Sequence, residues 1–221
     1  MQRLENLGLN GIKVYQDDEL YTFTSDSILL SKFASAKKNE DVADFCAGSG
    51  IVGFNFYALN KGLVKNLTFF EMQTPMFNLI NKSIKENDLQ AICFAKNVKL
   101  QEIDNSFNER FSLILCNPPY MKVQSGEINH LGNIAVCTSE VSLSLSELCA
   151  SFKKCLKFGG RVCLVHRADR LVEVICELKK NNIEPKRLQM VASNGKEPYL
   201  FMLEGVKGGK SGIKILNTAQ N

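Results

Sequence analysis

The sequence predicts an α/β fold in which a parallel sheet is covered by helices on both faces. Short apolar runs of the kind that form buried strands alternate along the chain with longer segments that carry apolar residues at helical spacing. Pairs of glycines or prolines lie at the ends of several of these runs, as expected where strands meet helices. A length of 221 residues and a hydrophobic fraction of 45% provide one domain with a core of normal size.

The predicted elements follow one another in a regular order. The first strand ends in a glycine-rich turn, and glycines also close the first and third helices at Gly62 and Gly159-Gly160. The predicted helices cover residues 51–61, 74–87, 140–156 and 170–181. The predicted strands cover residues 41–45, 66–71, 91–95, 111–116, 161–165, 188–192 and 199–203.

The alternation begins only after residue 35. We therefore expect residues 1–35 to form an N-terminal extension and residues 36–221 to form the main domain. Residues 205–221 are predicted to be a loop with a short strand over 213–216 and a frayed tail. In a parallel sheet of this kind, ligands bind beyond the carboxyl ends of the strands.

Composition narrows the possible classes of protein. No apolar run approaches the roughly 18 residues of a membrane span, and no secretory signal is visible. The eight cysteines include no C-x-x-C pair, so we expect no metal site and reduced thiols in a cytoplasmic protein. Residues 1–150 have 13 basic and 17 acidic residues, whereas residues 151–221 have 14 and 6. This basic C-terminal third is compatible with a polyanionic partner, although a solvated lysine-rich face explains the charge alone.

A glycine-rich loop follows the first predicted strand. Residues 44–50 read D-F-C-A-G-S-G, and with Gly53 they match the dinucleotide pattern G-x-G-x-x-G. Glu71 lies 21 residues after Gly50, where an acid that binds ribose is expected. The residues also suit S-adenosylmethionine, because Asp44 complements its ammonium group and would repel a pyrophosphate. We favour this methyl donor over NAD, with an ordinary strand–helix turn as a third interpretation.

A second motif, Asn117-Pro118-Pro119-Tyr120, ends the fourth predicted strand. Prolines remove backbone N–H donors, so carbonyls in this segment can point into a cleft. The amide oxygen of Asn117 and the carbonyl of Pro118 can accept hydrogen bonds from one planar NH₂ group. Such bonds direct the nitrogen lone pair toward a methyl carbon, and Tyr120 can stack on a flat substrate. Together with a loop that suits a nucleoside, this motif indicates methylation of an amino group.

These two motifs resemble those of class I S-adenosylmethionine-dependent methyltransferases that modify amino groups of adenine, of some guanines or of glutamine. Residues 21–30, 165–170 and 204–210 resemble the bacterial tRNA adenine-N6 methyltransferases that act in the anticodon loop of valine tRNA. The resemblance implies a Rossmann-like, mostly parallel sheet of seven strands whose last strand is antiparallel. It also implies S-adenosylmethionine as the cofactor and RNA, most simply tRNA, as the partner.

The resemblance further implies roles for individual residues. The N-terminal extension, residues 1–35, would cover the cofactor site, and Asp26 would either line the methionine pocket or cap a helix over 27–33. Asn97, after the third strand, would bond the cofactor adenine, and Glu71 would bind the ribose. The methionine end would lie against Asp44, Cys46, Ala47, Gly48 and Gly50. The catalytic residues would be Asn117, Pro118 and Tyr120, and the substrate-binding residues would be Pro119, Tyr120, Lys207 and Lys210.

Other candidates and two alternative functions stay open. His130 could act as a base, although an amine that attacks a sulfonium loses its proton only after transfer and needs none. His166 and Arg167 could contact RNA phosphate. The same motifs serve the glutamine N5-methyltransferases of peptide release factors, but these usually have a helical domain before the sheet, and only about 35 residues precede it here. A catalytically silent RNA-binding module is the other alternative, against which the intact N-P-P-Y motif argues.

Overall fold

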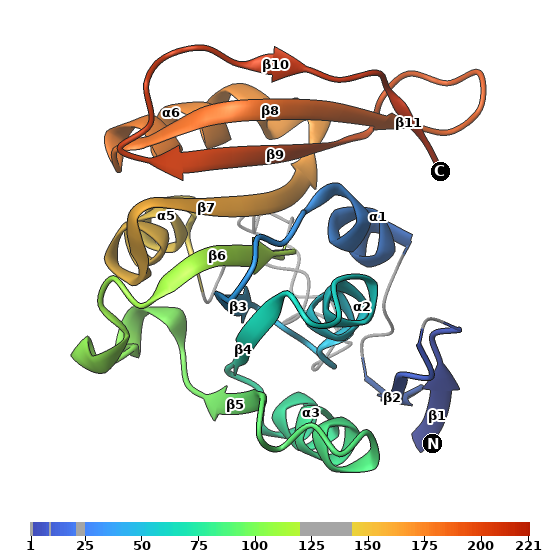
Figure 1. Cartoon of the computed structure of the whole chain (residues 1–221). Helices are drawn as coiled ribbons and strands as arrows, with labels where there is room; N and C mark the ends of the chain where they lie inside the picture. Colours follow the sequence, from blue (N-terminus) through green and yellow to red (C-terminus); the bar gives the residue numbers. More distant parts are fainter. Residues whose placement is uncertain (1, 9, 21–24, 120–142) are drawn as a thin grey trace, which may run out of the picture.

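The computed structural model describes residues 2–8, 10–20, 25–119 and 143–221. Its centre is a nine-stranded sheet with the order β10-β8-β9-β7-β6-β3-β4-β5, and β11 also pairs with β8 (Figure 1). All pairs in this sheet are parallel except those of β9, which runs antiparallel to β7 and to β8. Without the two short strands of the C-terminal tail, the sheet has the predicted seven strands, one of them reversed. The predicted fold class is therefore confirmed.

The elements have the following bounds. The strands are β1 (Gln2–Asn6), β2 (Lys13–Asp17), β3 (Glu40–Phe45), β4 (Val64–Glu71), β5 (Cys93–Asn97), β6 (Phe111–Cys116), β7 (Leu156–Arg167), β8 (Ile183–Ala192), β9 (Leu200–Lys207), β10 (Lys214–Ile215) and β11 (Ala219–Gln220). The helices are α1 (Ser25–Phe33), α2 (Ile51–Leu59), α3 (Thr74–Glu86), α5 (Leu145–Cys155) and α6 (Leu171–Lys180). Short 3-10 turns lie at η1 (Leu100–Glu102), η2 (Asn105–Phe107) and η3 (Ala168–Arg170).

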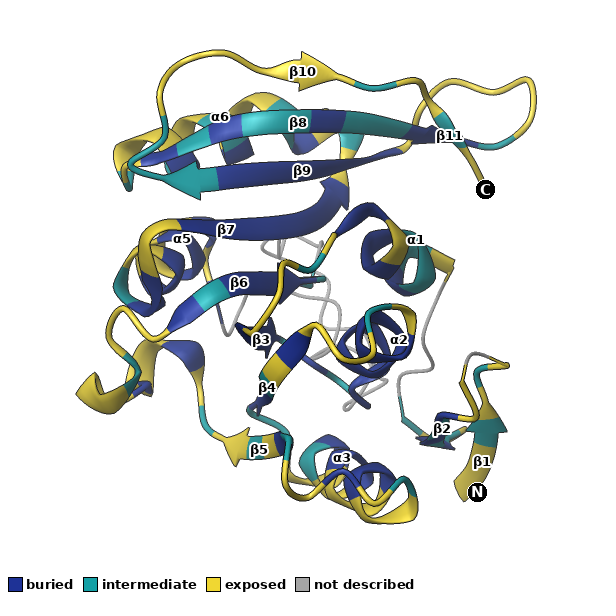
Figure 2. Ribbon diagram, viewed as in Figure 1, coloured by how far each residue is buried: buried dark blue, intermediate teal, exposed yellow. Residues whose placement is uncertain are grey.

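Helices cover both faces of the sheet, and each face has its own apolar cluster. Alternate residues of a strand point to opposite faces. In β6, Leu113 and Leu115 pack with the cluster that includes α1, α2 and α3. Ile114 and Cys116 pack with the cluster that includes α5 and α6. The central strands are accordingly buried on both sides (Figure 2), which explains why their sequences are continuous apolar runs rather than alternating ones.

The boundary between α5 and β7 differs from the prediction. The helix begins at a capping box, in which the Ser144 hydroxyl accepts from the Glu147 amide and the Glu147 carboxylate accepts from the Ser144 amide. It ends at Cys155, and β7 starts directly at Leu156. The glycine pair therefore does not close the helix. It lies inside the strand, at the point where the register with β6 shifts.

Both ends of the chain are more structured than predicted. β1 and β2 form an antiparallel hairpin, which contacts α3 because Tyr15 and Lys13 donate their amides to Ser83 and Asn87. The short strand predicted over 213–216 corresponds to β10. The prediction of a frayed tail is wrong, because the tail continues into β11 and pairs in parallel with β8. Among the helices of the described residues, none is long and apolar enough to cross a membrane.

Candidate active site

A cavity of about 650 Å³ opens where β3, β4, β6 and β7 reach their carboxyl ends. This edge is where parallel α/β sheets bind ligands, and the volume lies within the usual range of about 300–1,000 Å³ for small-molecule sites. The segments that follow these strands line one part of the cavity. The start of α1 and the start of β9 contribute further lining, as do Val98, Leu100, Gln101 and Leu143. The site therefore combines residues that are far apart in the sequence.

The glycine loop forms one wall of the cavity. Cys46, Ala47 and Gly48 line it, and Cys46 and Gly48 have positive φ angles of 55° and 57°. Gly50 also has a positive φ, of 85°, but it lies behind the lining, where a Cβ atom would be 2.8 Å from the Phe54 ring. The loop therefore brings backbone into the cavity, while Gly50 lets α2 start close to the sheet.

Asp44 lies beneath this loop and is fully buried. Its Oδ2 accepts a hydrogen bond of 2.8 Å from the amide of Gly53, whereas its buried Oδ1 has no hydrogen-bond partner among the described residues. Burial raises the pKa of Asp44 well above its usual value, and the nearby charge of Glu71 raises it further. Gly53 is required here, because a Cβ atom would lie 2.9 Å from Asp44 and 2.5 Å from the Phe69 ring.

Glu71, at the end of β4, lines the cavity beside the glycine loop. Its two carboxylate oxygens accept hydrogen bonds of 2.8 Å from the amides of Gly48 and Gln73. Burial raises the pKa of Glu71, and these amides oppose that shift. Each carboxylate oxygen can accept more than one hydrogen bond, so Glu71 holds the loop and keeps acceptor capacity toward the cavity.

Asn97 does not line the cavity. Its amide nitrogen donates to the carbonyls of Glu71 and Met72, and its amide oxygen accepts from the Thr74 hydroxyl at 2.9 Å. The neighbouring Val98 lines the cavity instead, together with Met72. In this structure Asn97 connects the ends of β4 and β5 rather than reaching the place predicted for the cofactor adenine.

Asn117 and Pro118 line the cavity at the end of β6, beside the glycine loop. The Asn117 amide nitrogen donates a 3.0 Å hydrogen bond to the hydroxyl of Ser27 on α1. This contact helps to fix the orientation of the Asn117 amide at the cavity wall. Pro119 also lines the cavity, whereas Tyr120 and His130 lie outside the described residues.

The start of α1 supplies two lining residues, Asp26 and Ser27. Asp26 was a candidate N-cap, but the helix begins at Ser25, so Asp26 lies inside the first turn. Ser27 was not among the predicted site residues. Its small size and its place next to Asp26 are the only local signals for it, and its role depends on a contact across 90 positions of the sequence.

His166 and Arg167, at the end of β7, differ in their access to the cavity. His166 is buried at 1% exposure, and its Nδ1 accepts from the Arg167 amide. Burial lowers its pKa to about 4, so the imidazole is neutral at pH 7. The hypothesis that His166 contacts phosphate is therefore wrong, because the side chain has no access to RNA. Arg167 lines the cavity, with its guanidinium 2.8 Å from the Asp169 carboxylate.

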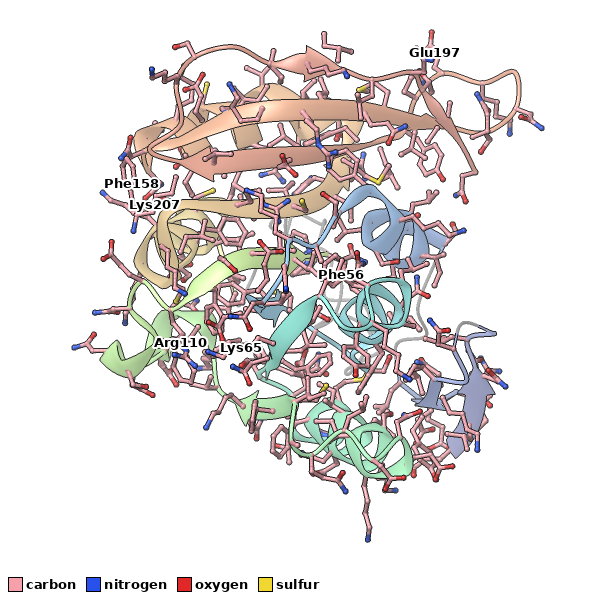
Figure 3. The ribbon with its side chains drawn as sticks, in the orientation of Figure 1. Phe56, Lys65, Arg110, Phe158, Glu197 and Lys207 are labelled. Atoms are coloured by element: carbon pink, nitrogen blue, oxygen red, sulfur yellow. The ribbon has the colours of Figure 1, made fainter. Side chains whose placement is uncertain are left out.

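Lys207 and Lys210 do not lie at the cavity. β9 begins at Leu200, which lines the cavity, and runs seven residues to Lys207, a rise of about 23 Å. The Lys207 ammonium donates to the carbonyls of Lys153 and Leu156 and pairs with Glu109 at 3.0 Å, at the edge where Figure 3 labels it. Lys207 thus stabilises the end of α5 rather than lining the cavity.

Within the described residues, no three His, Cys, Asp or Glu side chains are grouped so that they could hold a metal ion. The structure brings together Asp26, Cys46, Ala47, Gly48, Glu71, Asn117, Pro118 and Pro119 around one cavity. Asp44 and Gly50 support this wall from behind. Besides Ser27, sequence reasoning missed several lining residues, among them Met72, Val98 and Tyr199, the last of which lies just before β9.

Known proteins resemble this chain in sequence and in structure. A tRNA1(Val) (adenine(37)-N6)-methyltransferase of Shewanella woodyi is 27% identical over 188 residues, which is 82% of this chain and 75% of the relative. A putative protein N5-glutamine methyltransferase of Methanocaldococcus jannaschii is 27% identical over 119 residues, 54% of this chain and 56% of that protein. In structure, a predicted O-methyltransferase of Agrobacterium tumefaciens has a TM-score of 0.68 at 16% identity, over 88% of this chain and 86% of that one.

The sequence also matches a family as a whole. The family model described as "Methyltransferase small domain" matches residues 14–184, which include the glycine loop, Glu71 and Asn117. The match covers well over half of the chain. This chain therefore belongs to the methyltransferase small domain family.

Proposed function

We propose that this methyltransferase transfers a methyl group from S-adenosylmethionine to the exocyclic N6 amine of an adenine in RNA, with a tRNA anticodon loop as the substrate. The observation that carries the proposal is that Asn117 and Pro118 line the same cavity as the glycine loop and Glu71. An amine held at the end of β6 would then lie one strand away from a cofactor bound at the end of β3. Neighbouring strands are only about 4.8 Å apart.

The residues at the end of β3 fit S-adenosylmethionine. The buried Oδ1 of Asp44 has no hydrogen-bond partner among the described residues. The ammonium group of the cofactor, or a water molecule bound to that group, would supply the missing donor. Glu71 retains acceptor capacity for the two hydroxyls of a ribose. Membership of a methyltransferase family also favours this cofactor over NAD. When bound, the cofactor supplies a methyl carbon made electrophilic by its bond to a positively charged sulfur.

The chain's own residues would hold the amine and orient its lone pair. The amide oxygen of Asn117 and the carbonyl of Pro118 accept the two N–H groups, which turns the lone pair toward the methyl carbon. A nitrogen–carbon bond forms as the carbon–sulfur bond breaks, the electron pair stays on sulfur, and the amine then releases a proton to solvent. Catalysis is therefore positioning together with hydrogen bonding to the amine.

Residues 1–35 would act as an extension over the cofactor site, and residues 36–221 as the methyltransferase domain. Two contacts support this division. Gln16 of β2 donates a 2.7 Å hydrogen bond to the hydroxyl of Ser49 in the glycine loop. Asp26 and Ser27 of α1 line the cavity. The extension thus contacts both the glycine loop and, through Ser27, Asn117 of the N-P-P-Y motif.

Adenine in tRNA is favoured as the acceptor by the named relatives. The tRNA1(Val) (adenine(37)-N6)-methyltransferases of Shewanella woodyi and of a Flavobacteriaceae bacterium match 82% and 83% of this chain. Glutamine is the second candidate, because the archaeal relative named a putative protein N5-glutamine methyltransferase shares 27% identity over 54% of the chain. A planar NH₂ group is common to both acceptors, so the Asn117 assignment serves either reaction.

The test compares the two acceptors in one assay with labelled S-adenosylmethionine. An unmodified valine tRNA transcript and an unmethylated release factor are each incubated with the enzyme, and the products are digested and identified. We expect N6-methyladenosine in the RNA and no label in the protein. Asn117→Ala is the control, which should bind S-adenosylhomocysteine normally in calorimetry and transfer no methyl group. Label in the release factor alone would overturn the adenine assignment, and label in neither would favour a silent RNA-binding module.

A further inference from the structure

Tyr199 places an exposed aromatic ring on the rim of the cavity. It lies in the connection from β8 to β9 and is 40% exposed. Among the described residues that line the cavity, the other aromatic one is Phe70, which is 1% exposed and belongs to the core. A large ring that is half exposed beside a ligand cavity has a face available for contact with a flat ligand.

The strand order places Tyr199 on the acceptor side of the cavity. The loops after β3 and β6 hold the glycine loop and Asn117, and the next strands outward are β7 and β9. Because β9 is antiparallel, its first residues lie at the same edge, where Leu200 pairs with Arg167. β6 and β9 are two strand spacings apart, a distance of about 10 Å. Tyr199 is therefore on the side of Asn117 that faces away from the glycine loop.

This side is where an acceptor base would have to extend. In methyl transfer the sulfur, the methyl carbon and the attacking nitrogen are in line, so the rest of the acceptor lies beyond the nitrogen. With the donor over β3 and the amine at Asn117, the ring that carries the amine extends toward β7 and β9. Its flat face would then meet the residues that line the cavity there, Tyr199 among them.

Several hydrogen bonds hold Tyr199 in place. Its amide donates to the Val191 carbonyl, and its carbonyl accepts from the Ala168 amide, both at 3.0 Å. Its hydroxyl accepts from the side-chain amide of Asn221, which also donates to the Ser25 hydroxyl at 2.7 Å. Asn221 is itself held by the β11 pairing, since its amide donates to the Ala192 carbonyl. The tail thus connects the rim tyrosine to the start of α1.

We infer that the acceptor base stacks on Tyr199 with one of its faces, and that Asn221 is the positioning residue that holds the Tyr199 ring. This inference rests on the proposed function and deepens it by assigning base recognition to the C-terminal half of the sheet. Stacking on an aromatic face suits a nucleobase, which is flat on both sides. A glutamine side chain has no such extended face, so the same ring would favour an RNA acceptor over a protein.

The test compares substitutions of Tyr199 in methyl transfer to the unmodified valine tRNA transcript. Tyr199→Leu removes the flat face and should lower kcat/KM for RNA about 5- to 150-fold, the range that corresponds to about 1–3 kcal/mol per stacked base. Tyr199→Phe keeps the face. Tyr199→Phe and Asn221→Ala delete the same hydrogen bond from its two ends, so each should lower kcat/KM by at most about 13-fold. Because Asn221 also bonds Ser25, the double variant should be no worse than Asn221→Ala alone.

The controls separate substrate contact from a loss of structure. Phe158 is an aromatic residue with 76% exposure near Lys207, far from the cavity (Figure 3). Phe158→Leu should therefore leave kcat/KM for RNA unchanged. S-adenosylhomocysteine affinity should be unchanged in every variant, and the loss of one or two hydrogen bonds should lower the melting temperature by only a few degrees. Wild-type kcat/KM in Tyr199→Leu, or an equal loss of S-adenosylhomocysteine affinity, would overturn the inference alone. A wild-type enzyme that methylates the release factor and no RNA would instead overturn the proposed function and this inference with it.

Discussion

The hydrogen bond between Asn117 and Ser27 predicts a specific defect when Ser27 is replaced. The Asn117 nitrogen donates to the Ser27 hydroxyl at 3.0 Å, and this contact helps to fix the orientation of an amide that lines the cavity. In Ser27→Ala the amide loses this partner, so its orientation is held less firmly. A neutral hydrogen bond contributes about 0.5–1.5 kcal/mol, so we expect methyl transfer at saturating cofactor to slow about 2- to 13-fold. Asn117→Ala removes the acceptor itself and should slow it about 100-fold or more.

Single-turnover methyl transfer measures this effect without a contribution from product release. If Ser27 acts through Asn117, Ser27→Ala should cause no further loss in the Asn117→Ala background. Ser31→Ala is the matched control on the same helix, because the Ser31 hydroxyl bonds the Ile28 carbonyl and the Asn55 amide rather than Asn117. It should lower the melting temperature without slowing transfer. Equal slowing by both serine variants, or an undiminished effect of Ser27→Ala in the double variant, would refute the reasoning.

Three further predictions concern stability, measured by thermal unfolding. Gly53→Ala would place a Cβ atom 2.5 Å from the Phe69 ring, so we expect a loss of about 1–2 kcal/mol and a melting temperature about 2–8 °C lower; an unchanged value would contradict this. Arg161 pairs with Glu40 at 2.8 Å while both are buried, so Arg161→Met should destabilise by about 3–5 kcal/mol, and adding Glu40→Leu should recover part of the loss. His166 has a folded-state pKa of about 4 against an ordinary 6.5, so the unfolded chain takes up the proton first as the pH falls. Stability should be full above pH 6.5 and decline toward pH 4 by up to about 1.4 kcal/mol per pH unit, and His166→Gln should flatten that dependence.

The alternation of strands and helices was predictable because it depends on neighbours in the sequence. The apolar spacing of Met76, Leu79, Ile80 and Ile84 indicated a helix, and all four are buried in α3. Element ends were less predictable where the same residue type can serve two roles. Gly160 suggested the end of a helix, yet it lies in β7, where a Cβ atom would meet the Lys157 carbonyl at 2.8 Å.

The cavity wall was predictable for a similar reason. A residue that directly follows a parallel strand must lie at the carboxyl edge of the sheet, so Gly48, Glu71 and Asn117 could be expected to meet there. Their separation of up to 69 positions does not matter once the strands are parallel neighbours. The local sequence also favoured the positive φ angles of Gly48 and Gly50, since glycine adopts them at little cost, but not that of Cys46.

The sequence by itself thus determined the fold class, the glycine loop and the acceptor motif, because each depends on a few adjacent residues. The tertiary structure decided which distant residues join them. Ser27 reaches Asn117 and Asn221 reaches Tyr199 only because α1, β9 and β11 meet at one edge of the sheet. It also decided that Lys207 is excluded from the cavity, since an antiparallel strand of eight residues carries its two ends to opposite edges. Strand direction and pairing are long-range properties that charge and spacing along the chain do not specify.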